Sequence, residues 1–120
     1  MSLIKLNKKK LGTLNVISVR GTAPDAMMDL LRPSHAFIGA PSGNMREIIR
    51  SILDKNPAAR VVVSAIALET VGEIMDCIRG LDLEEDTINV SVSRSRKIGG
   101  YHLMTAQNPV HITVCSGWAV

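Results

Sequence analysis

An almost unbroken run of apolar residues, Arg60–Ile66 (RVVVSAI), constrains the fold of this chain most. Such a run is typical of a central strand in a parallel sheet that is covered on both faces. Apolar residues at helical spacing lie on both sides of it. One stripe comprises Met45, Ile48, Ile49, Ile52 and Leu53, and the other comprises Val71, Ile74, Met75 and Ile78. Strand and helix therefore alternate, which favours a layered α/β fold with a mostly parallel sheet.

Further elements follow from the same patterns. Strands are predicted at Asn15–Arg20, His35–Gly39, Thr87–Ser93 and Val110–Val114. A short helix is expected over Pro24–Leu31, and residues 94–109 are expected to form a loop. The last two strands have no helix between them, so we expect them to pair antiparallel.

The predicted helices share a possible start signal, a polar residue followed three positions later by an acid. The pairs are Thr22 with Asp25, Asn44 with Glu47, and Thr70 with Glu73. In a capping box, such side chains accept hydrogen bonds from the free N–H groups of the first turn. We therefore expect each helix to start at its pair, and we expect the second helix to stop at Asn56-Pro57.

Length and composition exclude several classes of protein. A chain of 120 residues and 13.0 kDa fits one domain, and 46% hydrophobic with 21% charged residues is a globular composition. No apolar run approaches the ~20 residues that a membrane-spanning helix needs. Cys77 and Cys115 are too few and too far apart for a disulfide framework or a zinc ribbon. We therefore expect no metal site and a reducing, cytoplasmic location.

Charge is distributed unevenly along the chain. Residues 1–20 are basic without acids, residues 21–86 hold all eleven acids, and residues 87–120 carry only Arg94, Arg96 and Lys97. A basic segment can meet a polyanionic ligand, nucleic acid included, or can simply form a solvated surface. One Phe, one Tyr and one Trp leave little for base stacking, which counts against nucleic acid.

Candidate site residues lie in the loops that follow predicted strands, because open α/β sheets bind ligands there. These loops are Gly21–Pro24, Gly39–Asn44, Ser64–Thr70 and Arg94–Gln107. Each also has a structural interpretation, since Gly21 and Gly39 can simply close tight turns. His102 lies beside two glycines, where acid–base chemistry is possible, whereas His35 and His111 fit strand patterns and are expected in the core or on the sheet surface.

Five segments together resemble a known family. They are Asn15–Pro24 (NVISVRGTAP), Ala36–Ile49 (AFIGAPSGNMREII), Arg60–Thr70 (RVVVSAIALET), Val90–Lys97 (VSVSRSRK) and Gly99–Val110 (GGYHLMTAQNPV). In this order they resemble the carboxyl-terminal, decarboxylating part of precorrin-6Y C5,15-methyltransferase, an enzyme of cobalamin biosynthesis. The resemblance runs from about Lys8 to Gly117. It implies a partial Rossmann-like methyltransferase fold with α/β/α layers and an antiparallel last strand.

The resemblance also implies a reaction and a set of site residues. The family uses S-adenosylmethionine to methylate C15 of a corrin precursor and is linked to decarboxylation of an acetate side chain. The positions that match cofactor contacts are Gly21, Thr22, Ala23, Gly39 and Ala40, with Thr22 where the family usually has Asp. Those that match substrate contacts are Ser42, Gly43, Asn44, Glu69, Thr70, Arg94, Arg96, Gly100, Tyr101 and His102. Tyr101 and His102 are the candidates for positioning or acid–base roles.

The chain departs from the family pattern at its start. Family members begin with two more strand–helix units, which carry the glycine-rich cofactor loop and the acid that binds ribose. Residues 1–120 are therefore expected to be the carboxyl-terminal portion of one domain, with Lys5–Gly12 as the end of a helix. The missing strands would lie between Asn15–Arg20 and His35–Gly39. We expect the gap to close by direct pairing of these strands, or by intertwining in a homo-oligomer (a dimer or a tetramer).

Three functions stay open at this point. The first is methylation and decarboxylation of a precorrin, completed by a separate amino-terminal half. The second is a non-catalytic module that binds a tetrapyrrole or a nucleotide. The third is a basic domain that binds nucleic acid.

Overall fold

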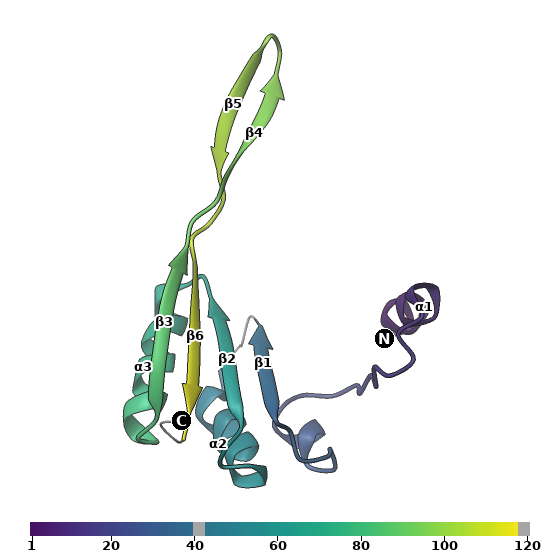
Figure 1. Ribbon diagram of the computed structural model, residues 1–120, viewed down its shortest axis with the longest axis vertical. Helices are drawn as coiled ribbons and strands as arrows, with labels where there is room; N and C mark the ends of the chain where they lie inside the picture. The colour runs from purple at the N-terminus through teal and green to yellow at the C-terminus, as the bar shows by residue number, and fades with distance from the viewer. Residues whose placement is uncertain (40–42, 118–120) are drawn as a thin grey trace. The chain divides into compact units, whose positions relative to one another are not determined.

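The computed structural model describes residues 1–39 and 43–117, which belong to two compact units divided between Leu30 and Leu31. The second unit contains a sheet of four strands in the order β1-β2-β6-β3 (Figure 1). The strands are β1 (His35–Gly39), β2 (Arg60–Ala65), β3 (Glu84–Val90) and β6 (Val110–Ser116). β1 and β2 are parallel, and β6 runs antiparallel to both of its neighbours, β2 and β3. β1, β2 and β3 therefore run in the same direction and β6 runs opposite to them, as predicted.

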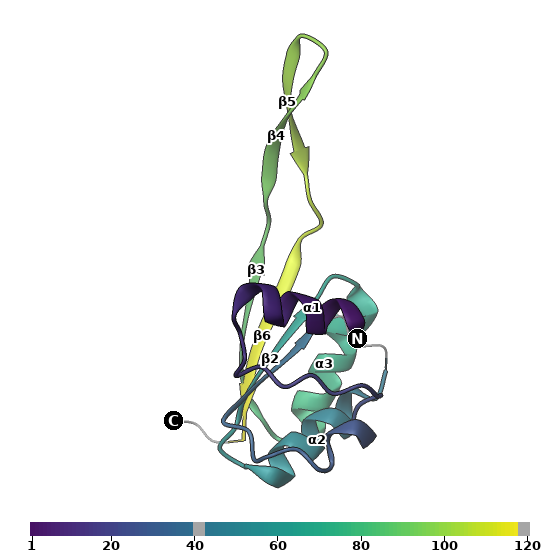
Figure 2. The ribbon, with the colours of Figure 1, turned by 90° about the vertical axis from the view of Figure 1, so that its right-hand side faces the viewer.

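Helices α2 (Met45–Lys55) and α3 (Leu68–Gly80) pack on the same face of this sheet (Figure 2). The largest fully buried side chains lie between these layers, and they are Met45, Ile49, Ile74, Val61, Val63, Thr113 and Cys115. The other face of the sheet is open within this unit, where Phe37 is 70% and Ile88 is 52% exposed. Among the described residues of this unit, helices therefore lie on one face of the sheet.

A second antiparallel pair, β4 (Ser93–Ile98) and β5 (Tyr101–Ala106), forms a hairpin where a loop was predicted. Gly99 and Gly100 make its two-residue turn, and Gly99 has a left-handed φ of 61° that side chains with a Cβ rarely adopt. Every residue of both strands is exposed. The predicted strand Thr87–Ser93 is replaced by β3, which starts at Glu84, and by β4, so the acidic residues 84–86 are strand rather than turn.

The first unit contains helix α1 (Ser2–Leu11), which ends at Gly12 with a left-handed φ of 69°. The predicted strand Asn15–Arg20 does not form, and the predicted helix Pro24–Leu31 is reduced to a 3-10 turn, η1 (Asp25–Met27). A strand needs a hydrogen-bonded neighbour and a short helix needs a packing partner, whereas Ile17 and Leu31 are 79% and 88% exposed. Within the described residues, the prediction of a strand at Asn15–Arg20 was therefore wrong.

The start of α2 directly after Asn44 is confirmed, but the predicted capping boxes do not form. Asn44 stands at the start of α2 with a φ of 57°, but its side chain makes no capping hydrogen bond. α3 begins at Leu68, after Ala67, so Thr70 lies inside its first turn instead of capping it. Thr22 caps nothing with its side chain, and only its carbonyl accepts a hydrogen bond, from the N–H of Ala26 at 2.9 Å. The predicted end of α2 before Asn56-Pro57 is confirmed.

Candidate functional site

The carboxyl ends of β1, β2 and β3 meet at one edge of the sheet, because these strands share a direction. Ligands of open α/β sheets bind at such an edge. Gly43 and Asn44 follow β1 there, and Glu69 and Thr70 lie in the first turn of α3, which follows β2. Four residues predicted to contact substrate therefore lie along this edge. Ala40 and Ser42, the other predictions in the β1 loop, lie outside the described residues.

The start of α2 fixes the backbone beside this edge. Gly43 and Asn44 have left-handed φ values of 85° and 57°, and the next residue, Met45, is completely buried. A buried anchor directly after these two backbone conformations holds the backbone of Gly43 and Asn44 in place. Gly43 and Asn44 themselves stay exposed, so their polar groups face solvent or a ligand.

One polar pair at this edge was not predicted as part of the site. Asn89 on β3 lies opposite His111 on β6, and Asn89 Nδ2 and His111 Nε2 are 3.4 Å apart. Ser91 Oγ donates to Asn89 Oδ1 at 3.1 Å. The other ring nitrogen of His111, Nδ1, is buried without a hydrogen-bond partner in the described part of the chain. The sequence offers no signal for this pair, because it depends on the register between β3 and β6.

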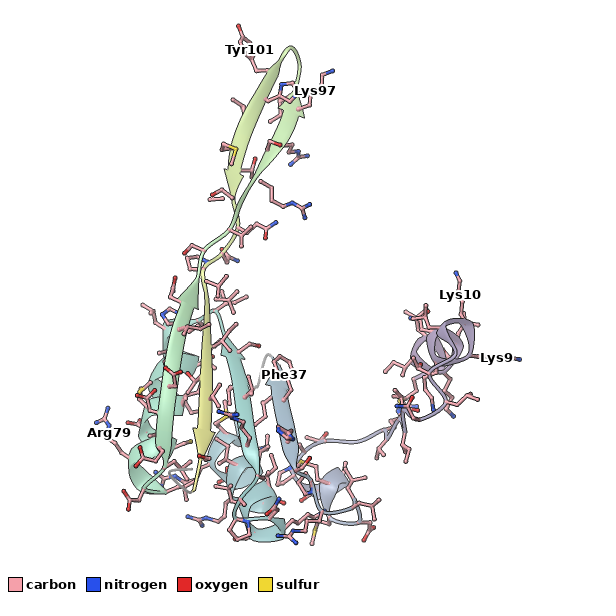
Figure 3. The ribbon with its side chains drawn as sticks, viewed as in Figure 1. Lys9, Lys10, Phe37, Arg79, Lys97 and Tyr101 are labelled. Carbon is pink, nitrogen blue, oxygen red and sulfur yellow. The ribbon has the colours of Figure 1, made fainter. Side chains whose placement is uncertain are left out.

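The hairpin carries the remaining substrate candidates away from this edge. Tyr101 pairs with Ile98 next to the turn, and Figure 3 shows Tyr101 at the tip. Ile98 lies eight positions beyond Val90, where β3 ends, and at ~3.3 Å per residue this corresponds to about 26 Å of extended chain. Arg94 lies near the base of the hairpin, about 13 Å along the strand by the same rise. The structure therefore separates Tyr101 and His102 from Gly43, Asn44, Glu69 and Thr70 of the same chain.

The predicted cofactor residues are divided between the two units. Gly21, Thr22 and Ala23 belong to the first unit and Gly39 belongs to the second. Gly21 has a φ of 152°, and a Cβ there would lie 2.6 Å from Ala26 Cβ, so only glycine fits this turn. These residues offer backbone groups and one hydroxyl, but no carboxylate for a ribose. The donor groups of Gly21, Thr22 and Ala23 are therefore not sufficient to hold S-adenosylmethionine.

The cysteines and acids of the described residues add no second reactive centre. Burial raises the pKa of the Cys115 thiol to about 11, with smaller contributions from Cys77 and Glu85. Burial also raises the pKa of Cys77. Both thiols therefore stay protonated near neutral pH and are poor nucleophiles. Among residues 1–39 and 43–117, no cluster of His, Cys, Asp and Glu could hold a metal ion, and no helix is long and apolar enough to span a bilayer.

Comparison with known families now decides what this fold is. A model of the precorrin methyltransferase domain matches residues 1–116. The chain belongs to the precorrin methyltransferase family. A curated relative from Methanothermobacter thermautotrophicus, named "Probable cobalt-precorrin-6B C(15)-methyltransferase (decarboxylating)", is 35% identical over 97 residues. That alignment covers 80% of this chain and 50% of the relative.

Solved structures of the family have the same fold. A precorrin-8W decarboxylase from Methanobacterium thermoautotrophicum superposes with a TM-score of 0.84 at 32% identity, covering 98% of this chain and 63% of that one. A precorrin-6Y C5,15-methyltransferase from Geobacter metallireducens also gives a TM-score of 0.84, at 26% identity, covering 94% of this chain and 60% of that one. The Rossmann-like α/β fold is thereby confirmed. This family member spans about half to two thirds of the length of these relatives.

Proposed function

We propose that this chain takes part in S-adenosylmethionine-dependent methylation of C15 of a precorrin and in decarboxylation of its acetate side chain. The observation that carries the proposal is the family match over residues 1–116, supported by the name of the relative at 35% identity. S-Adenosylmethionine would supply the methyl group. Since the donor groups of Gly21, Thr22 and Ala23 are not sufficient to hold it, we propose that activity needs the portion of the relatives that this chain does not span.

The basic hairpin supports a role in substrate binding. A precorrin carries several carboxylate side chains, and charge-assisted hydrogen bonds from guanidinium groups are well suited to hold them. Arg94, Arg96 and Lys97 lie on β4, and no acid occurs after Asp86 in the sequence. We propose that Arg94 and Arg96 bind substrate carboxylates, and that Tyr101 at the tip positions the macrocycle.

The sheet edge supports a second contact region of the same site. Gly43 and Asn44 present polar groups beside β1, and Glu69 and Thr70 do so beside β2. We propose that these residues, with Ser42, contact the substrate, and that Asn89 and His111 support them from β3 and β6.

Association with another copy or with a separate amino-terminal half belongs to the same proposal. In the described part of the chain, β1 pairs only with β2, so its outer edge keeps free N–H and C=O groups. Free edges of this kind favour pairing with a further strand. A homo-oligomer in the cytoplasm, a dimer or a tetramer, would satisfy them.

Equilibrium titration separates this proposal from nucleic-acid binding. The probe is uroporphyrin, a tetrapyrrole with acetate and propionate side chains, followed by its fluorescence. We expect it to bind this chain at moderate salt, and we expect a duplex oligonucleotide at equal concentration not to displace it. Displacement by the oligonucleotide, with no selectivity for the tetrapyrrole, would support the basic nucleic-acid-binding alternative instead.

A further inference from the structure

The pairing of β4 with β5 determines on which of the two faces of the hairpin each side chain lies. Residues directly opposite each other in an antiparallel pair share a face, and successive residues alternate between faces. One face, called the arginine face here, comprises Arg94, Arg96, Ile98, Tyr101, Leu103 and Thr105. The opposite face comprises Ser93, Ser95, Lys97, His102, Met104 and Ala106.

The arginine face combines cationic and apolar groups in alternation. Arg96 lies directly opposite Leu103, and Ile98 lies directly opposite Tyr101. These apolar side chains are far from buried, since Leu103 is 49% and Tyr101 is 76% exposed. Neither Arg94 nor Arg96 has a carboxylate partner within residues 1–39 and 43–117. The face therefore offers free guanidinium groups beside free apolar surface.

This combination matches one kind of ligand. A tetrapyrrole has a flat apolar ring with carboxylates around its rim, so it needs apolar contact and cations at the same time. A small polycarboxylate needs only the cations. Leu103 and Tyr101 can cover the ring while Arg94 and Arg96 reach the rim, because all four project from one face of a hairpin.

We infer that the arginine face, and not the opposite face, binds the rim and ring of a polycarboxylate tetrapyrrole. The inference rests on the proposed function and adds the division between faces to it. Arg94, Arg96, Tyr101 and Leu103 are then ligand contacts. Lys97 and His102, which lie opposite each other on the other face, are not.

Adjacent residues of one strand provide matched variants. Arg96→Gln and Lys97→Gln each remove one positive charge from neighbouring exposed positions of β4, so they change the net charge equally. Leu103→Ala and Met104→Ala form the corresponding apolar pair on β5. Uroporphyrin is titrated into the unmodified chain and into each variant, and circular dichroism verifies that every variant is folded. Citrate serves as a competitor without a ring.

The expected result is asymmetric. Arg96→Gln weakens uroporphyrin binding about two- to fivefold, as one exposed ion pair would, whereas Lys97→Gln leaves the Kd unchanged. Leu103→Ala weakens binding more than Met104→Ala does, and citrate does not compete at equal concentration. Equal weakening by Arg96→Gln and Lys97→Gln would overturn the inference, because it would mean that binding follows overall charge. If the unmodified chain binds no uroporphyrin, the inference fails, whereas the proposed function is tested separately by methyl transfer in a hybrid enzyme.

Discussion

Met45 links the core to the candidate site, because it is completely buried while Gly43 and Asn44 directly before it lie at the sheet edge. Met45→Ala removes the side chain that anchors the first turn of α2. Large-to-small substitution at a fully buried site costs about 2–5 kcal/mol, the sum of lost transfer free energy and the cavity left behind. At about 3 kcal/mol, the equilibrium constant for unfolding rises roughly 100-fold. With a urea dependence of about 2 kcal/mol per molar, the unfolding midpoint falls by about 1.5 M.

Met104→Ala is the matched control, because the same atoms are removed from a side chain that is 68% exposed on β5. Its unfolding free energy should stay within about 0.5 kcal/mol of the unmodified chain. Urea titrations of the three proteins, followed by circular dichroism, measure both effects. If the Met45→Ala midpoint coincided with that of Met104→Ala, the packing assigned to the first turn of α2 would be refuted.

Three further predictions concern the framework of the second unit. Thr113→Val should lower the free energy of unfolding by about 1 kcal/mol in urea titration, because it removes the 3.0 Å hydrogen bond between the Thr113 and Thr87 hydroxyls. An unchanged free energy of unfolding would contradict that hydrogen bond. Asn56→Ala should lower the free energy of unfolding by about 2 kcal/mol, because Asn56 Nδ2 donates to the Pro33 carbonyl at 2.8 Å and Oδ1 accepts two further hydrogen bonds. An unchanged free energy of unfolding would contradict these hydrogen bonds. The pKa of Cys115 lies above its ordinary value, at about 11 in place of 9.0, so its contribution to stability is complete below pH 9 and is lost as the pH rises towards 11. Unfolding free energies measured across that range should fall less for Cys115→Val, and an identical fall in both proteins would refute the assignment.

Apolar patterns predicted helices and strands correctly where the segment packs against or pairs with another element. They failed where no such element is present among the described residues. The stripe of α2 contains Met45, Ile48 and Ile49, which are all buried against the sheet, and β1 forms at its predicted residues. Asn15–Arg20 has an equally strand-like pattern, yet no strand is formed there among the described residues. Alternation of apolar residues indicates which strand a segment can form, but only a hydrogen-bonded neighbour stabilises that strand.

The hairpin was missed for a different reason. Gly99-Gly100 between alternating residues is a turn signal, but the basic residues of β4 leave both strands without a buried face, so the usual apolar alternation is absent. The pair of Asn89 and His111 depends on the register between β3 and β6, which the spacing of the strands does not determine. Glu69 and Thr70 could be placed at the sheet edge from sequence, because they lie shortly after a buried strand.

The proposed function is tested most directly by a hybrid enzyme. This chain is joined to the portion of the Methanothermobacter thermautotrophicus relative that lies outside their alignment, which covers 50% of that relative. Transfer of a labelled methyl group from S-adenosylmethionine to a precorrin is measured together with release of carbon dioxide. We predict that the hybrid does both, whereas this chain alone does neither. A folded hybrid that binds S-adenosylhomocysteine but transfers no methyl group and releases no carbon dioxide would contradict the account and favour a non-catalytic binding module.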